Sequence, residues 1–159
     1  MSVMFSYTSK LGTVFNCQCG RKHSIPLKSV VIQENAAAEI PVILAREGLG
    51  TKGLIVCDQN TWPLAGKEIQ EILASKGYNI KVCILNDDSE VKPDESSITH
   101  ILLEFDPSMD FLLAVGSGTI NDLVRFISYK TGKPYIVFAT APSMDGYAST
   151  VSPLLIKGF

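Results

Sequence analysis

The feature that most constrains the fold is the alternation of short apolar runs with amphipathic segments. Four runs of aliphatic and aromatic residues recur along the chain: GLIVCD (53–58), NIKVCILN (79–86), FLLAV (111–115) and PYIVFAT (134–140). Continuous apolar runs are typical of parallel strands covered on both faces. Strands that alternate with helices predict βαβ units, and right-handed crossovers place helices on both sides of the sheet. The predicted fold is therefore α/β, a Rossmann-like doubly wound parallel sheet.

The segments between these runs carry apolar residues at helical spacing and recognisable helix ends. Helices are expected over 34–48, where Pro41 can break or kink the helix, and from an N-cap at Thr61 through Leu64, Ile69, Ile72 and Leu73 to Gly77. Two more are expected, from an Asp94 cap with Ile98, Ile101, Leu102 and Phe105 on the apolar face, and from Thr119 or Ile120 to Lys130 before Gly132. SVVI (29–32) predicts one further short strand.

The first 30 residues differ from the rest of the chain. They hold short β-like pieces around a tight turn at Cys19-Gly20-Arg21-Lys22, which predicts a small hairpin. A length of 159 residues fits one domain. We therefore expect a β-rich segment over 1–30 that precedes an α/β core over 31–159.

Charge and composition exclude several classes of protein. The balance of 14 basic and 16 acidic residues gives a net charge of −2, which argues against a nucleic-acid partner. No stretch approaches the roughly 18 apolar residues of a transmembrane helix, and the N-terminus does not resemble a signal peptide. Two of the four cysteines, Cys57 and Cys83, lie inside apolar runs. Free thiols in a reducing compartment are expected, which predicts a cytoplasmic protein without membrane contact.

The strongest local motif is AVGSGTIND (114–122), where an apolar run leads through two glycines into a helix. Glycines let the backbone approach a ligand closely, and a helix N-terminus favours an anion such as a phosphate. The third glycine of the dinucleotide fingerprint is missing, since Asn121 and Asp122 follow. A phosphate site and a plain strand-to-helix turn are equally favoured by the spacing alone. A P-loop is excluded, because the chain has no G-x-x-x-x-G-K-[ST].

Two further segments end at the same predicted edge of the sheet. Asp58 follows an apolar run and could accept hydrogen bonds from a ribose, although an aspartate in a turn or N-cap is the commoner case. Because ligands bind at the carboxyl ends of parallel strands, its coincidence with the glycine turn favours a nucleotide. The loop FATAPSMDGYAST (138–150) contains Asp145 and could wrap a ligand or be an ordinary exposed loop.

Cys17, Cys19 and His23 form a further group near the N-terminus. A structural zinc site takes four ligands with two to four residues between the cysteines, whereas these cysteines are separated by one. The pattern therefore favours a β-turn over a metal site. His100 lies in a predicted helix and reads as structural, and Ser117 does not lie in a nucleophile elbow, G-x-S-x-G.

Two segments, GSGTINDLVRF (116–126) and YIVFATAPSMDGYAS (135–149), resemble the sn-glycerol-1-phosphate dehydrogenases. These enzymes form a branch of the iron-containing alcohol dehydrogenase, glycerol dehydrogenase and dehydroquinate synthase superfamily. The Cys-x-Cys-Gly…His opening resembles the bacterial branch. The resemblance implies an N-terminal dinucleotide-binding domain, a helical C-terminal domain, and an active site between them.

The resemblance also implies roles for individual residues. The cofactor would be NAD(H) or NADP(H), with Asp58 on the adenosine ribose and Asp145 on the hydroxyls of the substrate. An aspartate at position 58 favours NAD(H), although relatives use both cofactors. The pyrophosphate turn and the second cofactor loop would be formed by Gly116, Ser117, Gly118, Thr119, Ile120, Asn121 and Asp122, and by Thr140, Ala141, Pro142, Ser143 and Ser149.

The same resemblance implies a divalent metal, Zn or Ni, held by one aspartate and two histidines in the helical domain. Those ligands are not expected in this sequence, so the chain is interpreted as a cofactor-binding half without catalytic or metal residues. The complete enzyme would be a homodimer that reduces dihydroxyacetone phosphate to sn-glycerol 1-phosphate. A glycerol dehydrogenase or dehydroquinate synthase relative, and a stand-alone nucleotide-binding module without catalysis, remain alternatives.

Overall fold

The computed structural model describes residues 10–85 and 90–158 and divides the chain into two compact units, 1–36 and 37–159. In the first unit, β1 (Val14–Asn16) and β2 (Lys22–Ser24) form an antiparallel hairpin. The turn between them contains Gly20 at φ +81°, a value that suits glycine. The predicted hairpin is confirmed. The predicted strand at 29–32 is wrong, because β-branched residues form a strand only where a neighbouring strand pairs with them.

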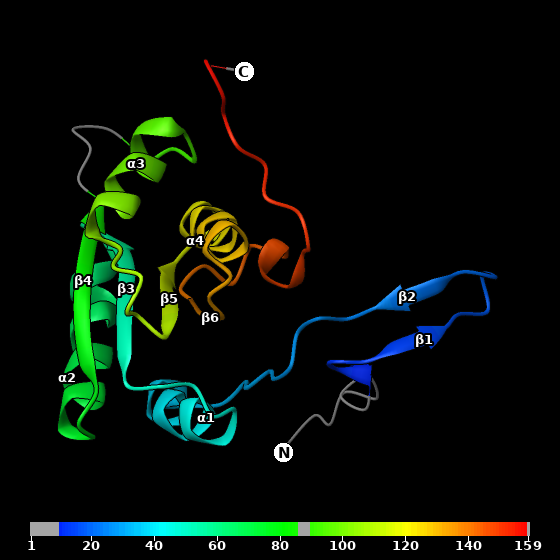
Figure 1. Cartoon of the computed structure of the whole chain (residues 1–159), viewed down its shortest axis with the longest axis horizontal. Helices are drawn as coiled ribbons and strands as arrows, with labels where there is room; N and C mark the ends of the chain where they lie inside the picture. Colours follow the sequence, from blue (N-terminus) through cyan, green and yellow to red (C-terminus); the bar gives the residue numbers. More distant parts are fainter. Residues whose placement is uncertain (1–9, 86–89, 159) are drawn as a thin grey trace. The chain divides into compact units, whose positions relative to one another are not determined.

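The second unit is built on a four-stranded parallel sheet (Figure 1). Its strands are β3 (Lys52–Asp58), β4 (Asn79–Leu85), β5 (Phe111–Gly116) and β6 (Tyr135–Ala139), in the order β4-β3-β5-β6. All four predicted strands are confirmed within the described residues. The chain winds outward from β3 to β4, returns past β3 to β5, and continues to β6. This reversal makes β3 and β5 neighbours, with Val56 opposite Ala114.

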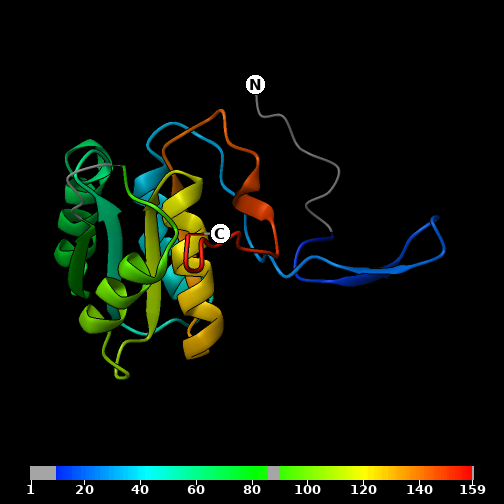
Figure 2. The same ribbon diagram turned by 90° about the horizontal axis from the view of Figure 1, so that it is seen from above.

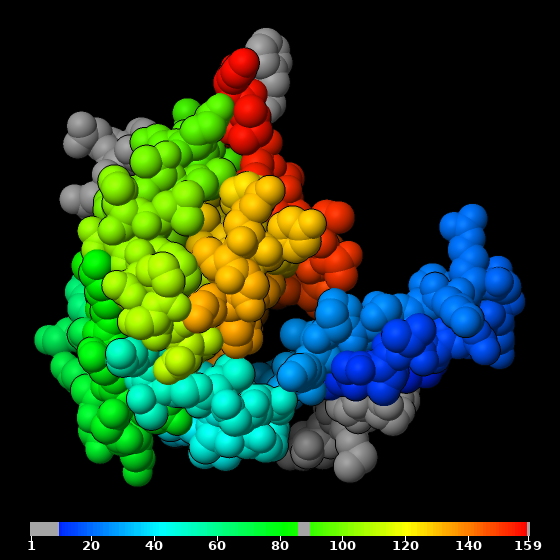
Figure 3. All heavy atoms as spheres, viewed as in Figure 1, coloured from blue at the N-terminus to red at the C-terminus, as the bar shows by residue number. Residues whose placement is uncertain are grey.

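Helices cover both faces of this sheet (Figures 1 and 2). The turn η2 (Ala36–Glu39) leads into α1 (Ile40–Arg46), and η3 (Trp62–Gly66) leads into α2 (Lys67–Ser75), both on one face. The other face carries α3 (Glu95–Glu104) and α4 (Gly118–Thr131), which lie side by side in Figure 3. Each face has its own buried apolar core. The doubly wound arrangement is confirmed.

Two helix ends that were predicted from neighbouring residues alone are found in the structure. Asp94 caps α3 by accepting a hydrogen bond from the Ser97 backbone N–H at 3.0 Å, and Gly132 ends α4 at φ +68°, as predicted. Pro41 lies in the first turn of α1, where a missing N–H is tolerated, and the residues before it form a 3₁₀ turn.

Leu64 and Leu102 were predicted to lie on the apolar faces of their helices, but both side chains are exposed. Leu64 is 66% exposed, because the segment that follows Thr61 begins as the π-helical turn η3, whose wider winding places Leu64 away from the core. Leu102 is 44% exposed, at the edge of the face of α3 that buries Ile101.

Within residues 10–85 and 90–158, no helix has both the length and the apolar character needed to cross a membrane.

Candidate functional site

The carboxyl ends of β3 and β5 meet where the winding of the sheet reverses. β3 runs on into a helix on one face, whereas β5 runs on into α4 on the other face. Asp58 lies two residues after Val56, and Gly116 lies two residues after its partner Ala114. The predicted aspartate and the predicted glycine turn are thus brought to neighbouring strand ends. In open α/β sheets this is the position of the ligand crevice.

Asp58 organises the turn that leaves β3. Its Oδ1 accepts hydrogen bonds from the backbone N–H groups of Asn60 and Thr61, at 2.9 and 2.7 Å, and from the Thr61 hydroxyl at 3.0 Å. The Asp58 N–H in turn donates to Thr61 Oγ1 at 3.0 Å. Thr61 is the N-cap residue of η3, as predicted, but its side chain makes no capping hydrogen bond, because the hydroxyl is bonded to Asp58. Every hydrogen bond that the described residues make to this carboxylate uses Oδ1, so a ligand could still bind Oδ2.

The turn that leaves β5 needs both of its glycines for different reasons. A Cβ added at Gly116 would lie 2.5 Å from Ile120 Cγ1, inside the core. A Cβ added at Gly118 would lie 2.5 Å from Met144 Cε, which is the far end of a flexible side chain. Gly118 begins the 14-residue helix α4, whose first N–H groups are available for an anion. Met144 therefore covers a helix N-terminus that it could readily leave.

Asn121 lies in the first turn of α4, three residues after Gly118 and hence on the same side of the helix. It is 1% exposed. Neither its Nδ2 nor its Oδ1 has a hydrogen-bond partner among the described residues. Most buried amides in native proteins are satisfied, and leaving one unsatisfied costs about 1–3 kcal/mol. A buried amide of this kind beside a glycine turn is consistent with a bound ligand that completes its hydrogen bonds.

The loop after β6 packs against the glycine turn through its backbone and one tyrosine. The Thr140 N–H donates to the carbonyl of Gly116 at 3.1 Å. Tyr147 lies in η4 (Gly146–Ala148). Its hydroxyl contacts the carbonyls of Gly116 and Ala141 at 3.3 and 3.2 Å. The same hydroxyl accepts from the Ala141 N–H at 3.3 Å. Thr140 and Ala141 are therefore brought to the glycine turn.

Arg125 fixes the rest of this loop. It is 8% exposed, and its guanidinium donates to the carbonyls of Val151, Gly146 and Tyr147 at 2.6, 2.9 and 3.4 Å. It also pairs with Asp122 at 2.7 Å. Burial raises the pKa of Asp122, and the Arg125 charge offsets only part of this effect. Sequence reasoning missed Arg125 and Tyr147, because a lone arginine and a lone tyrosine carry no motif.

The remaining predicted residues differ in what they can offer a ligand. The Ile120 side chain is fully buried in the core, so that residue could contribute only its backbone. Pro142, Ser143 and Asp145 are exposed. Ser149 Oγ bonds the backbone of Val151, which occupies its hydroxyl within the loop. Ser117 and Thr119 are half-buried at the start of α4.

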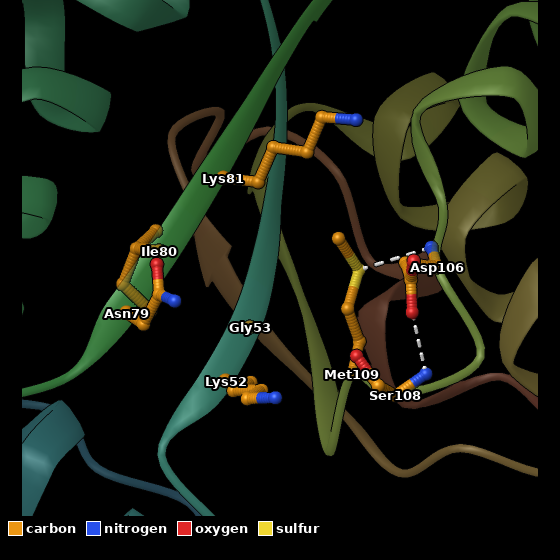
Figure 4. A pocket seen from close by; sticks show the side chains of 8 residues that line it. All are labelled: Lys52, Gly53, Asn79, Ile80, Lys81, Asp106, Ser108 and Met109. Carbon is orange, nitrogen blue, oxygen red and sulfur yellow. Dashed lines mark hydrogen bonds between the residues drawn. The ribbon is translucent and has the colours of Figure 1, made fainter.

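A hollow of about 390 Å³ lies at the opposite, amino-terminal edge of the sheet (Figure 4). It is lined by the starts of β3 and β4 and by the loop before β5. Asp106 in this loop accepts from the Ser108 N–H at 2.7 Å, and its own N–H donates to Met109 Sδ at 3.5 Å (Figure 4). Lys81 is paired with Glu104 at 2.9 Å. We favour the carboxyl edge, since Asp106, Ser108 and Lys81 in the lining of the hollow already have bonding partners.

Residues 31–158 match the family described as iron-containing alcohol dehydrogenase. The chain belongs to this family. It is 36% identical over 145 residues to glycerol-1-phosphate dehydrogenase (NAD(P)+) of Halalkalibacterium halodurans, and 33% identical over 160 residues to that of Bacillus licheniformis. These alignments cover 89% and 99% of the chain. The chain spans only 36% and 39% of the length of those two relatives.

Solved structures share the fold. Sulfoacetaldehyde reductase from Bifidobacterium kashiwanohense in complex with NAD+ aligns with a TM-score of 0.56 and 19% identity, covering 78% of this chain and 37% of that one. The 2-epi-5-epi-valiolone synthase of Streptomyces hygroscopicus, with NAD+ and Zn²⁺ bound, gives 0.55 and 22%, covering 71% and 32%. At these identities the likeness shows the architecture alone.

Proposed function

We propose that this chain is the NAD(P)-binding part of a dehydrogenase that reduces dihydroxyacetone phosphate to sn-glycerol 1-phosphate. The observation that carries the proposal is the meeting of Asp58 and the Gly116–Gly118 turn at the reversal of the winding. Relatives at 33% and 36% identity that bear the name glycerol-1-phosphate dehydrogenase support the choice of reaction. The proposal extends to a cytoplasmic homo-oligomer, and the free cysteines favour such a reducing compartment.

The residues at the carboxyl edge suit a dinucleotide. The pyrophosphate would lie on the N-terminus of α4, where Gly118 leaves room once the Met144 side chain moves aside. The Asn121 amide would gain the hydrogen-bond partners that it lacks in the free chain, and Asp58 Oδ2 would accept from the adenosine ribose. The bound cofactor supplies the hydride, and the protein supplies binding and orientation.

In the proposed enzyme, this chain would help to bind the substrate but would not bind the catalytic metal. Asp145 is exposed on the loop that Arg125 holds, so it is available to the hydroxyls of a substrate. The chain has two histidines, one in each unit, so the α/β unit does not supply an aspartate and two histidines for a metal. We therefore assign no metal-dependent step to these residues and expect no turnover from this chain alone.

The test is a calorimetric titration of the 159-residue chain with NADH and with NADPH. Saturable binding is expected, and Gly118→Val should weaken it at least tenfold by placing a branched side chain over the helix N-terminus. Asp58→Ala removes the side-chain oxygens that hold the turn and the proposed contact to the ribose. Asp58→Asn keeps one oxygen that can hold the turn but removes the negative charge. Binding that is weakened by both Asp58 variants assigns the carboxylate to the cofactor.

A matched control is Lys81→Ala, which changes the hollow at the opposite edge. This variant should bind NADH like the parent chain. Loss of binding in Lys81→Ala, with unchanged binding in Gly118→Val, would place the ligand at the wrong edge for our proposal. Oxidation of NADH by dihydroxyacetone phosphate with this chain alone would contradict the assignment of catalysis to other residues.

A further inference from the structure

Three potential metal ligands converge in the N-terminal hairpin. The sulfur atoms of Cys17 and Cys19 and a ring nitrogen of His23 all lie within 4.8 Å of one another. A tetrahedral zinc ion with bonds of about 2.3 Å to sulfur and 2.0 Å to nitrogen would hold such atoms roughly 3.5–3.8 Å apart. Small side-chain rotations would bring the three atoms onto one ion. Cys19 and His23 are exposed and Cys17 is half-buried, so an ion can reach them from solvent.

The hairpin brings a third potential ligand, His23, next to the two cysteines. The Cys17 N–H donates to the carbonyl of Arg21 at 2.9 Å, and the Gly20 N–H donates to the carbonyl of Cys17 at 3.0 Å. These bonds close the turn and bring β2 back alongside β1. His23 thereby returns to Cys19, with Nε2 lying 3.1 Å from Sγ. The one-residue separation of the cysteines is no obstacle, because the third ligand comes from the opposite strand.

An aromatic neighbour and the chemistry of the three groups suit a bound metal ion. The Phe15 ring stacks on the His23 imidazole, with ring centroids 5.9 Å apart and planes at 28°, and so orients the ring. Metals bind the thiolate form of cysteine. Two thiolates and an imidazole form a donor set that suits Zn²⁺.

A metal cross-link would also stabilise the first unit. None of its described residues, 10–36, is buried, so this part has no apolar core. An isolated two-stranded hairpin is marginally stable in water. Structural metals stabilise small units of this kind, because the free energy of metal binding adds to that of folding.

We propose that Cys17, Cys19 and His23 bind one Zn²⁺ ion, whose fourth position is taken by water or an added ligand. The ion links β2 to the turn and stabilises the hairpin. This site does not depend on the proposed function, since it uses other residues in the other unit.

The test uses the 159-residue chain, stripped of metal and kept reduced with a phosphine. Co²⁺ serves as the spectroscopic probe, followed by Zn²⁺ in competition with a colorimetric chelator. One equivalent of Co²⁺ should give thiolate-to-cobalt charge transfer and intense tetrahedral d–d bands, which Zn²⁺ should remove. Cys17→Ser, Cys19→Ser and His23→Gln should each weaken Zn²⁺ binding by more than the roughly 10–100-fold typical of changes to residues that only orient a metal ligand. Phe15→Leu should weaken it about tenfold.

Matched controls are His100→Gln and Cys83→Ala, which should bind like the parent chain. Backbone amide spectra of residues 13–25 should become more dispersed when Zn²⁺ is added, and this readout does not depend on the α/β unit. Absence of a stoichiometric cobalt spectrum would overturn the proposal. Binding that survives Cys17→Ser and His23→Gln unchanged would also overturn it, because the ion would then lie elsewhere.

Discussion

The Tyr147 hydroxyl lies 3.3 Å from the carbonyl oxygen of Gly116 and thereby joins the loop after β6 to the end of β5. The same oxygen accepts from the Ala141 N–H at 3.3 Å. One phenol therefore sets the spacing between two segments that the proposed cofactor would contact. Arg125 fixes the other end of the same loop through three carbonyls. The shape of the proposed site is thus determined by two side chains that need not touch the ligand.

Tyr147→Phe should reduce NADH affinity several-fold while leaving the fold intact. The change removes the hydroxyl and nothing else, so the free energy of unfolding should fall by about 1 kcal/mol. Calorimetry and thermal unfolding measure the two effects. Tyr129→Phe is the control, because that side chain is 81% exposed. Equal NADH affinity in Tyr147→Phe and the parent chain would show that the bridge does not shape the site.

Gly116→Ala and Gly118→Ala should separate packing from ligand access. The new methyl at 116 would meet Ile120 in the core, so unfolding should become easier by about 1–3 kcal/mol. The methyl at 118 would meet only the end of Met144, so stability should change little. Denaturant unfolding measures the difference. The prediction is contradicted if Gly118→Ala proves the more destabilised of the two.

Asn121→Leu should stabilise the free chain and weaken cofactor binding. The parent buries an amide without partners, and replacing it with an apolar group of similar size removes a cost of about 1–3 kcal/mol. The bound state loses the hydrogen bonds that we propose for the amide. Thermal unfolding with and without NADH checks both halves. A variant that is destabilised in the free chain would show that the amide is satisfied there.

Asp122 should make stability fall as pH rises through the acidic range. Burial raises the pKa of this carboxyl in the folded chain, so between the unfolded and folded pKa values the native state holds more protons. Unfolding free energies from about pH 3 to pH 6, compared with Asp122→Asn, isolate this component. The parent chain should lose stability relative to the variant as pH rises. A gain would mean that the pairing with Arg125 outweighs burial, and Asp145→Asn controls for general charge effects.

The four thiols should react in two pairs. Burial raises the pKa of Cys57 to about 12 and that of Cys83 to about 11, so neither forms a thiolate readily near neutral pH. In metal-free native chain, a disulfide reagent should modify Cys17 and Cys19 rapidly and the other two only after denaturation. Added Zn²⁺ should protect the fast pair. Rapid modification of all four native thiols would contradict the burial of β3 and β4.

Local sequence patterns were enough to predict the strands and most helix ends of the α/β unit. Four apolar runs became four strands, and Asp94 and Gly132 marked helix ends, because strand burial and capping depend on residues close together in the chain. The glycine turn was predictable for the same reason. The strand proposed at 29–32 failed, since pairing requires a neighbour that a local pattern cannot supply.

The contacts between groups far apart in the chain come from the three-dimensional packing. It placed β5 beside β3, and so brought Asp58 to the glycine turn. It also directed the Arg125 guanidinium onto a loop more than 20 residues away and left the Asn121 amide buried. His23 reached Cys19 through the pairing of β2 with β1. Such contacts depend on strand order and long-range packing, which periodicity in the sequence does not encode.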